Sequence, residues 1–105
     1  RGTSISIPFE SQDKNVISSY HILPILLPDG SDRTTVIELL KAKRIQTSIH
    51  YPPFWSFSAY KEDFLPESCP VTAQICSREL TLPLFPTMTN QEVDQVSYEL
   101  LASLE

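Results

Sequence analysis

The fold is decided by residues 20–50, YHILPILLPDGSDRTTVIELLKAKRIQTSIH, which predict a strand, a helix and a second strand in that order. Tyr20–Leu27 is short and apolar apart from His21, which is typical of a buried strand. Pro24 removes one donor from the hydrogen-bond ladder, so we expect a sheet edge or a bulge at this point. Residues 28–31, PDGS, have the chemistry of a turn.

The helix is expected to be capped by Ser31 or Asp32 and to run to about Arg44. It has an apolar stripe at helical spacing. The stripe consists of Val36, Leu39 and Leu40, with Ile37 at its margin. Cations gather in the predicted last turn: Lys41, Lys43 and Arg44. Positive charge there complements the helix dipole, so the cluster needs no ligand to explain it.

Ile45–His50 alternates and is rich in strand-forming residues, so we predict a second strand. Two parallel strands joined by a helix normally form a right-handed crossover. Residues 51–53, YPP, end this strand, and the aromatic segment that follows is irregular, with one helical turn at most.

The second half predicts a helix from Pro70 to about Glu79, because proline suits the first helical position. Leu80–Phe85 is predicted as a third strand, and Pro83 again indicates an edge. Residues 89–92, TNQE, form a capping box, and the flanking apolar residues can form a hydrophobic staple. The staple would join Met88 to Val93. The apolar stripe of the last helix consists of Val93, Val96, Leu100 and Leu104. We therefore expect an α+β fold with a small, mostly antiparallel sheet and helices on one face.

The composition limits the classes of function. A net charge of −5 and a pI near 4.9 argue against nucleic-acid binding, which needs a basic surface. No apolar stretch approaches the roughly 20 residues that cross a bilayer, and the start lacks a signal-peptide core, so a cytoplasmic location is expected. Cys69 and Cys76 are interpreted as small apolar residues, with Cys76 buried, because their spacing fits neither a disulfide nor zinc.

Little catalytic chemistry is present. His21 and His50 lack metal-ligand spacing to other donors, and two glycines cannot build a phosphate loop or a nucleophile elbow. Three carboxylates in a predicted loop are interpreted as a solvated face: Glu62, Asp63 and Glu67. We therefore predict no catalytic residue, no cofactor-binding residue and no metal ligand in this chain.

Two features remain as candidates. His50 and Tyr51 lie at a predicted strand end, where a polar side chain can point into a cleft. The alternative for His50 is a structural histidine with its hydrogen bonds satisfied. Five aromatic residues crowd into eleven positions: Phe54, Trp55, Phe57, Tyr60 and Phe64. They form either part of the core or a contact surface for a partner.

Three blocks in order resemble one family: SSYHI followed by LLPDG and Asp32-Arg33, then LKAKRIQTSIHYPP, then LTLPLFPTMT. Together they are similar to the C-terminal part of the DegT/DnrJ/StrS family of sugar aminotransferases, which are pyridoxal-phosphate enzymes of fold type I. The resemblance covers most of residues 18–104.

The resemblance implies that residues 18–105 are a small C-terminal domain packed on a missing N-terminal large domain, in a homodimer. Residues 1–17 would be the connecting arm, and a chain that starts with Arg1 is interpreted as a fragment. The large domain would bind the pyridoxal phosphate and supply its Schiff-base lysine, so no lysine of this chain is expected to be catalytic. The small domain would close the active site and help to bind a nucleotide-sugar substrate through His50 and Tyr51.

The sequence departs from the family pattern at two places. Arg44 stands where the family usually has a helix-capping glycine, and Phe54-Trp55 stands where many members have Leu-His. Two alternatives stay open. One is a stand-alone, ferredoxin-like module that binds a small molecule, and the other is a domain of a pyridoxal-phosphate-dependent sugar dehydratase.

Overall fold

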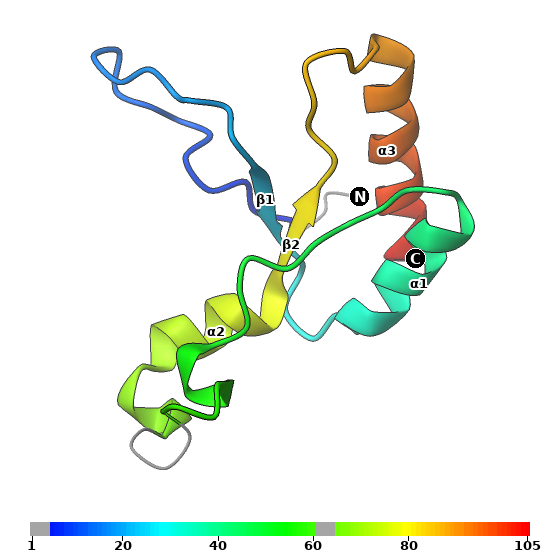
Figure 1. The fold of residues 1–105 in the computed structure, drawn as a ribbon. Helices are drawn as coiled ribbons and strands as arrows, with labels where there is room; N and C mark the ends of the chain where they lie inside the picture. Colours follow the sequence, from blue (N-terminus) through cyan, green and yellow to red (C-terminus); the bar gives the residue numbers. More distant parts are fainter. Residues whose placement is uncertain (1–4, 61–64) are drawn as a thin grey trace.

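The computed structural model describes residues 5–60 and 65–105, and within them it has an α+β fold (Figure 1). In chain order the elements are β1 (Leu23–Leu26), α1 (Arg33–Ala42), the short 3-10 turns η1 (Phe54–Ser56) and η2 (Pro66–Ser68), α2 (Pro70–Arg78), β2 (Glu79–Leu82) and α3 (Asn90–Ser103). Figure 1 shows α1 and α3 together on one side of the sheet, while α2 extends from the start of β2. The predicted fold class is confirmed.

The sheet is formed by β1 and β2, which pair antiparallel from Leu23 opposite Leu82 to Leu26 opposite Glu79. β1 lies inside the segment predicted for it, whereas β2 begins one residue before its predicted start at Leu80, and both strands are shorter than predicted, at four residues each. Two single bridges extend the sheet on either side, Ser6 opposite Leu26 and Ser48 opposite Thr81, and both are antiparallel.

Prolines end the pairing at the outer edge of β1. Ser6 and Leu26 exchange both backbone hydrogen bonds, at 3.0 and 2.8 Å. In an antiparallel ladder with this register, the next such pair would be Pro8 and Pro24. Neither proline has an N–H to donate, so the bridge stays isolated. Pro24 thus lies with its missing donor on the edge of the β1–β2 sheet, as predicted.

The predicted strand Ile45–His50 is wrong, because only its Ser48 pairs with the sheet. Ser48 and Thr81 exchange hydrogen bonds of 3.0 and 2.8 Å, so the next pair would be His50 and Glu79. The backbone N–H of His50 instead donates to the side-chain Oε2 of Glu79, at 2.8 Å. The backbone oxygen of Glu79 accepts from Arg33 at 3.1 Å. Side chains thus take both groups that would have extended the ladder.

The expected strand–helix–strand unit is split by β2. β1 and the segment around Ser48 are each antiparallel to β2 and lie on its opposite sides, so they run in the same direction. The helix between them, α1, therefore connects two parallel segments that pair with β2 and not with each other. This arrangement places residue 50 beside the start of β2.

The core lies between the sheet and the two helices α1 and α3. Its members are eight buried apolar residues: Ile25, Leu27, Val36, Leu40, Ile45, Leu80, Val96 and Leu100. The predicted stripes are confirmed by the buried Val36, Leu40, Val96 and Leu100. They are wrong for Leu39 and Val93, which are 47% and 45% exposed. Leu39 lies three residues after the buried Val36, and Val93 lies three residues before the buried Val96, so each is displaced by about 60° around its helix and faces solvent.

Side chains cap both long helices at their N-termini. Asp32 Oδ1 accepts from the backbone N–H of Thr35 at 3.2 Å, and Oδ2 accepts from the Thr35 hydroxyl at 2.8 Å. The hydroxyl bond and then the backbone bond lower the pKa of the Asp32 carboxyl below its ordinary value. The predicted capping box at the start of α3 is confirmed, with Thr89 and Glu92 bonding to each other's backbone N–H.

The C-terminus of α1 is a Schellman motif centred on Arg44. The N–H of Ile45 donates to Leu40 O and that of Arg44 donates to Lys41 O, both at 2.9 Å. Arg44 takes the left-handed conformation, with φ 63°. The arginine thus adopts the backbone that the family's glycine would adopt. Of the three cations expected in the last turn, only Lys41 lies there, because Lys43 is already the C-cap.

The second helix, α2, leads directly into β2 and begins with Pro70, as predicted. The guanidinium of Arg33, from the start of α1, donates to the carbonyl of Cys76 at 2.5 Å. This contact places positive charge at the C-terminus of α2, where the helix dipole favours it. Cys76 and Cys69 are both free and half-buried, so the expectation that Cys76 is buried is wrong. The reason is that α2 has no buried residue and lies outside the core.

Candidate functional site

The sequence-predicted site residues lie just beyond the bridge to β2. His50 is half-buried, whereas Tyr51 is 68% exposed. Their rings meet edge to face, with centroids 4.9 Å apart and planes at 90°. The structure therefore brings the two side chains into contact.

His50 belongs to a hydrogen-bond network with two residues of β2, Glu79 and Thr81. The ring atom Nδ1 lies 2.8 Å from Thr81 Oγ1, and the backbone N–H of His50 donates to Glu79 Oε2 at 2.8 Å. The Thr81 hydroxyl donates in turn to Glu79 Oε1 at 2.5 Å. Glu79 and Thr81 are 4% and 6% exposed, so the network fixes the imidazole from the protein side.

Sequence reasoning missed Glu79 and Thr81. The prediction placed Glu79 at the end of α2, but it is the first residue of β2. The available signal was an acidic residue joined directly to the apolar run Leu80–Phe85, where a buried carboxylate needs partners. Only the fold supplies those partners, because His50 is 29 positions away along the chain.

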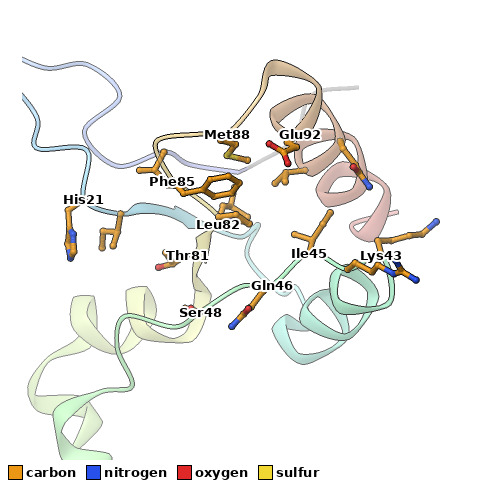
Figure 2. A pocket seen from close by; sticks show the side chains of 16 residues that line it. His21, Lys43, Ile45, Gln46, Ser48, Thr81, Leu82, Phe85, Met88 and Glu92 are labelled. Carbon is orange, nitrogen blue, oxygen red and sulfur yellow. The ribbon is translucent and has the colours of Figure 1, made fainter.

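A cleft of about 680 Å³ is lined in part by Thr81 (Figure 2). It lies between residues 43–48, the segment that continues from β2, and the start of α3. Its polar lining includes Gln46, Ser48 and Glu92, and its apolar lining includes Phe85 and Met88. Such mixed walls suit a ligand with both polar and apolar parts.

The predicted residues His50 and Tyr51 do not line this cleft, but Thr81 does. Thr81 thus touches the cleft and also holds the His50 ring. The other histidine, His21, is exposed and lies at the cleft wall (Figure 2). The hydrogen-bond network and the cleft are therefore neighbouring features that share one residue.

Two of the three clustered cations also line the cleft, Lys43 and Arg44. Lys43 Nζ lies 3.7 Å from Glu99 Oε1, and this ion pair joins α1 to α3. The structural explanation for the basic cluster thus holds for Lys43 through an ion pair, in addition to the dipole effect at Lys41.

The aromatic segment packs on itself and outside the core. Phe54 makes edge contacts with Trp55 at 5.1 Å and with Tyr60 at 6.0 Å between ring centroids. Phe57 and Tyr60 are both 48% exposed, and Phe64 lies outside the described residues. None of the four described rings belongs to the core cluster, so the core interpretation is wrong for them.

Metal-ion ligands and membrane-spanning helices are considered for the described residues, 5–60 and 65–105. In this part of the chain, no group of three or more His, Cys, Asp or Glu side chains is arranged to hold a metal ion. None of its helices combines the length and the apolar character needed to span a membrane.

The sequence of this chain is similar to that of a known protein family. The model of the DegT/DnrJ/EryC1/StrS aminotransferase family matches residues 2–101. The chain belongs to this family. One relative is a dTDP-3-amino-3,6-dideoxy-alpha-D-galactopyranose transaminase of Aneurinibacillus thermoaerophilus, 33% identical over 88% of this chain and 24% of that protein. An uncharacterized protein of Methanocaldococcus jannaschii is 32% identical over 79% of this chain and 23% of its own length.

Solved structures described as aminotransferases share the fold. A protein of Streptococcus pneumoniae described as a sugar aminotransferase, Spr1654, superimposes in its PMP form with a TM-score of 0.84 and 25% identity, over 94% of this chain and 25% of that one. Its PLP form gives a TM-score of 0.81 at 26% identity, over 94% of this chain and 26% of that one. A Brucella abortus member shares the fold at 22% identity, with a TM-score of 0.76 over 95% of this chain and 26% of that one. The chain spans about a quarter of the length of the curated relatives it matches.

Proposed function

We propose that this chain is the C-terminal small domain of a pyridoxal-phosphate-dependent aminotransferase that acts on keto-sugar nucleotides, with an amino acid as nitrogen donor. The observation that carries the proposal is the family match over residues 2–101 in a chain that spans about a quarter of its relatives. The substrate class is supported by the relative named as a dTDP-amino-sugar transaminase.

The cofactor is proposed to be bound by the N-terminal large domain. Support comes from the similar Streptococcus pneumoniae protein, which was solved in PLP and PMP forms. The residues of this chain do not fit the cofactor by themselves. The described lysines are all exposed, and Lys43 is paired with Glu99. A Schiff-base lysine is typically desolvated in an apolar pocket, and these exposed lysines are not. The described lysines are Lys14, Lys41 and Lys43.

The role proposed for this domain is to close the active site and to help bind the sugar nucleotide through His50 and Tyr51. The half-buried imidazole is held from one side by Thr81, which leaves its Nε2 atom without a hydrogen-bond partner among the described residues. The exposed Tyr51 hydroxyl can donate and accept. Binding energy from such remote contacts helps to orient a substrate at the reacting centre.

The division of the chain is proposed from the same resemblance: a connecting arm over residues 1–17 and the small domain over residues 18–105. The described part of the arm is attached to the fold, since Ser6 pairs with Leu26 and Ile5 packs against the core. The exposed rings of Phe57 and Tyr60 are the proposed contact surface for the large domain. The homodimer and the cytoplasmic location remain predictions.

The test uses the complete enzyme, expressed from the reading frame that contains this chain. We expect it to bind pyridoxal phosphate and to transfer an amino group from glutamate or another amino acid to a keto-sugar nucleotide. Replacing His50→Gln or Tyr51→Phe should raise KM for the sugar nucleotide about 2- to 12-fold, the value of one hydrogen bond, while the cofactor spectrum stays unchanged. Tyr98→Phe, at an exposed position that does not line the cleft, is the matched control and should leave KM unchanged.

Two results would contradict the proposal. Absence of bound pyridoxal phosphate in the complete enzyme would refute the assignment as an aminotransferase domain. An unchanged KM in both site variants would refute the substrate role of His50 and Tyr51 alone. The dehydratase alternative is separated by the product, which would have lost a hydroxyl group without gaining an amine. The family match and the length of the relatives favour a domain over a stand-alone, ferredoxin-like module.

A further inference from the structure

Glu79 has a buried carboxylate without an ionic partner among the described residues. Glu79 is 4% exposed, and among the described residues no cation forms a salt bridge with it. Both of its oxygens accept hydrogen bonds from neutral donors, Oε2 from the backbone N–H of His50 and Oε1 from the hydroxyl of Thr81. Arg33 also touches this residue, but it donates to the backbone oxygen of Glu79 and not to the carboxylate. A buried carboxylate is stable only with such donors, so both bonds have a fixed direction.

The direction of these bonds determines the direction of the hydrogen bond between Thr81 and His50. A threonine hydroxyl has a single hydrogen, and Thr81 gives that hydrogen to Glu79 at 2.5 Å. Toward His50 Nδ1, 2.8 Å away, Thr81 Oγ1 can therefore only accept. Nδ1 must carry a hydrogen, and in a neutral imidazole Nε2 then has a lone pair and no hydrogen.

We propose that Glu79, acting through Thr81, fixes His50 in the Nδ1–H tautomer and so makes Nε2 a hydrogen-bond acceptor for a hydroxyl group of the ligand. This inference rests on the substrate role proposed for His50 and states the chemistry of that contact. A phosphate oxygen would need a donor at Nε2, whereas a sugar hydroxyl can donate to the lone pair. Glu79 and Thr81 are thus positioning residues, and they select a hydroxyl over a phosphate at this point.

The test is NMR of the 105-residue chain labelled with ¹⁵N in its two histidines. Long-range proton–nitrogen spectra distinguish the two neutral tautomers by the shifts of both ring nitrogens. The measurement is made at about pH 8.5, above the ordinary pKa of an imidazole, about 6.5. His50 should be in the Nδ1–H form. His21 is exposed and makes no hydrogen bond within the described residues, so it reports the unbiased mixture in the same sample.

Three substitutions separate positioning from packing. In Glu79→Gln, the amide oxygen must still accept from His50 N–H, so the amide NH₂ faces Thr81 and donates to it. The threonine hydrogen is then released toward Nδ1, and His50 should switch to the Nε2–H form. Thr81→Val should return His50 to the mixture seen for His21, whereas Thr81→Ser should keep the Nδ1–H form.

The inference is overturned if wild-type His50 is in the Nε2–H form or matches His21, because either result means that Glu79 does not direct the chain of bonds. An unchanged tautomer in Glu79→Gln would also overturn it. The wild-type spectrum alone identifies the tautomer of His50, so the test stands even where a variant fails to fold. Since the tautomer is read without substrate, a negative result here leaves the aminotransferase assignment intact, and a negative result in the enzyme assay leaves the tautomer intact.

Discussion

Replacing Arg44→Gly should stabilise the chain. Arg44 holds a left-handed conformation, φ 63°, that costs a residue with a Cβ atom about 1–2 kcal/mol relative to the right-handed region. Glycine removes this cost but loses about 0.5–1 kcal/mol more entropy on folding than alanine does. The Arg44 side chain is exposed and makes no hydrogen bond or ion pair within the described residues, so little else is lost. The net gain should be about 0.5–1 kcal/mol.

The assays are thermal unfolding and urea unfolding of the 105-residue chain, both followed by the helical circular dichroism signal. A gain of this size should raise Tm by about 2–8 °C and shift the urea midpoint without changing the slope. Arg44→Ala is the matched control, because it removes the same side chain but keeps the Cβ atom, and it should change stability by less than about 0.5 kcal/mol. If glycine is no better than alanine at this position, the strain at residue 44 is not what limits this helix end.

Three further predictions concern the core and the helix caps. Leu40→Ala should lose about 2–5 kcal/mol of unfolding free energy because Leu40 is fully buried, while Leu39→Ala, at an exposed position, should lose less than about 1 kcal/mol. Thr89→Ala should lose about 0.5–2 kcal/mol by opening the capping box, which a lower urea midpoint would report. The lowered pKa of Asp32 means that its contribution is complete above its ordinary pKa of 3.8 and is lost as the pH falls through the lowered value. The difference in midpoint between the wild type and Asp32→Ala should therefore disappear on acidification from about pH 6 to about pH 2.

Elements set by local signals could be predicted from the sequence. Asp32 begins α1 and Thr89 with Glu92 begins α3, because a cap bonds to backbone within three residues of itself. Pro70 fixed the start of α2 for the same reason. The left-handed Arg44 could be anticipated as one of two outcomes, since a helix that lacks a capping glycine must either strain that residue or end differently.

The features that the sequence did not predict depend on contacts between residues that are distant along the chain. The segment Ile45–His50 has the composition of a strand, but its pairing ends where Glu79 and Arg33 take the groups of the next hydrogen-bonded pair. These residues come from the start of β2 and the start of α1, so no window along the sequence contains the interaction. The same holds for Thr81, whose role at His50 follows from its place opposite Ser48. The position of His50 near a strand end was predictable, but its partners were not.

The prolines beside β1 affect how this chain behaves in concentrated solution. An unpaired strand edge invites a second molecule to add its own backbone, which is a common route to aggregation. Here Leu26 is already engaged by Ser6, and Pro24 and Pro8 offer no N–H along the neighbouring stretch. A second copy approaching this edge would find acceptors without donors and could not continue a ladder. A sheet of only two strands can therefore remain small without assembling into fibrils from this side.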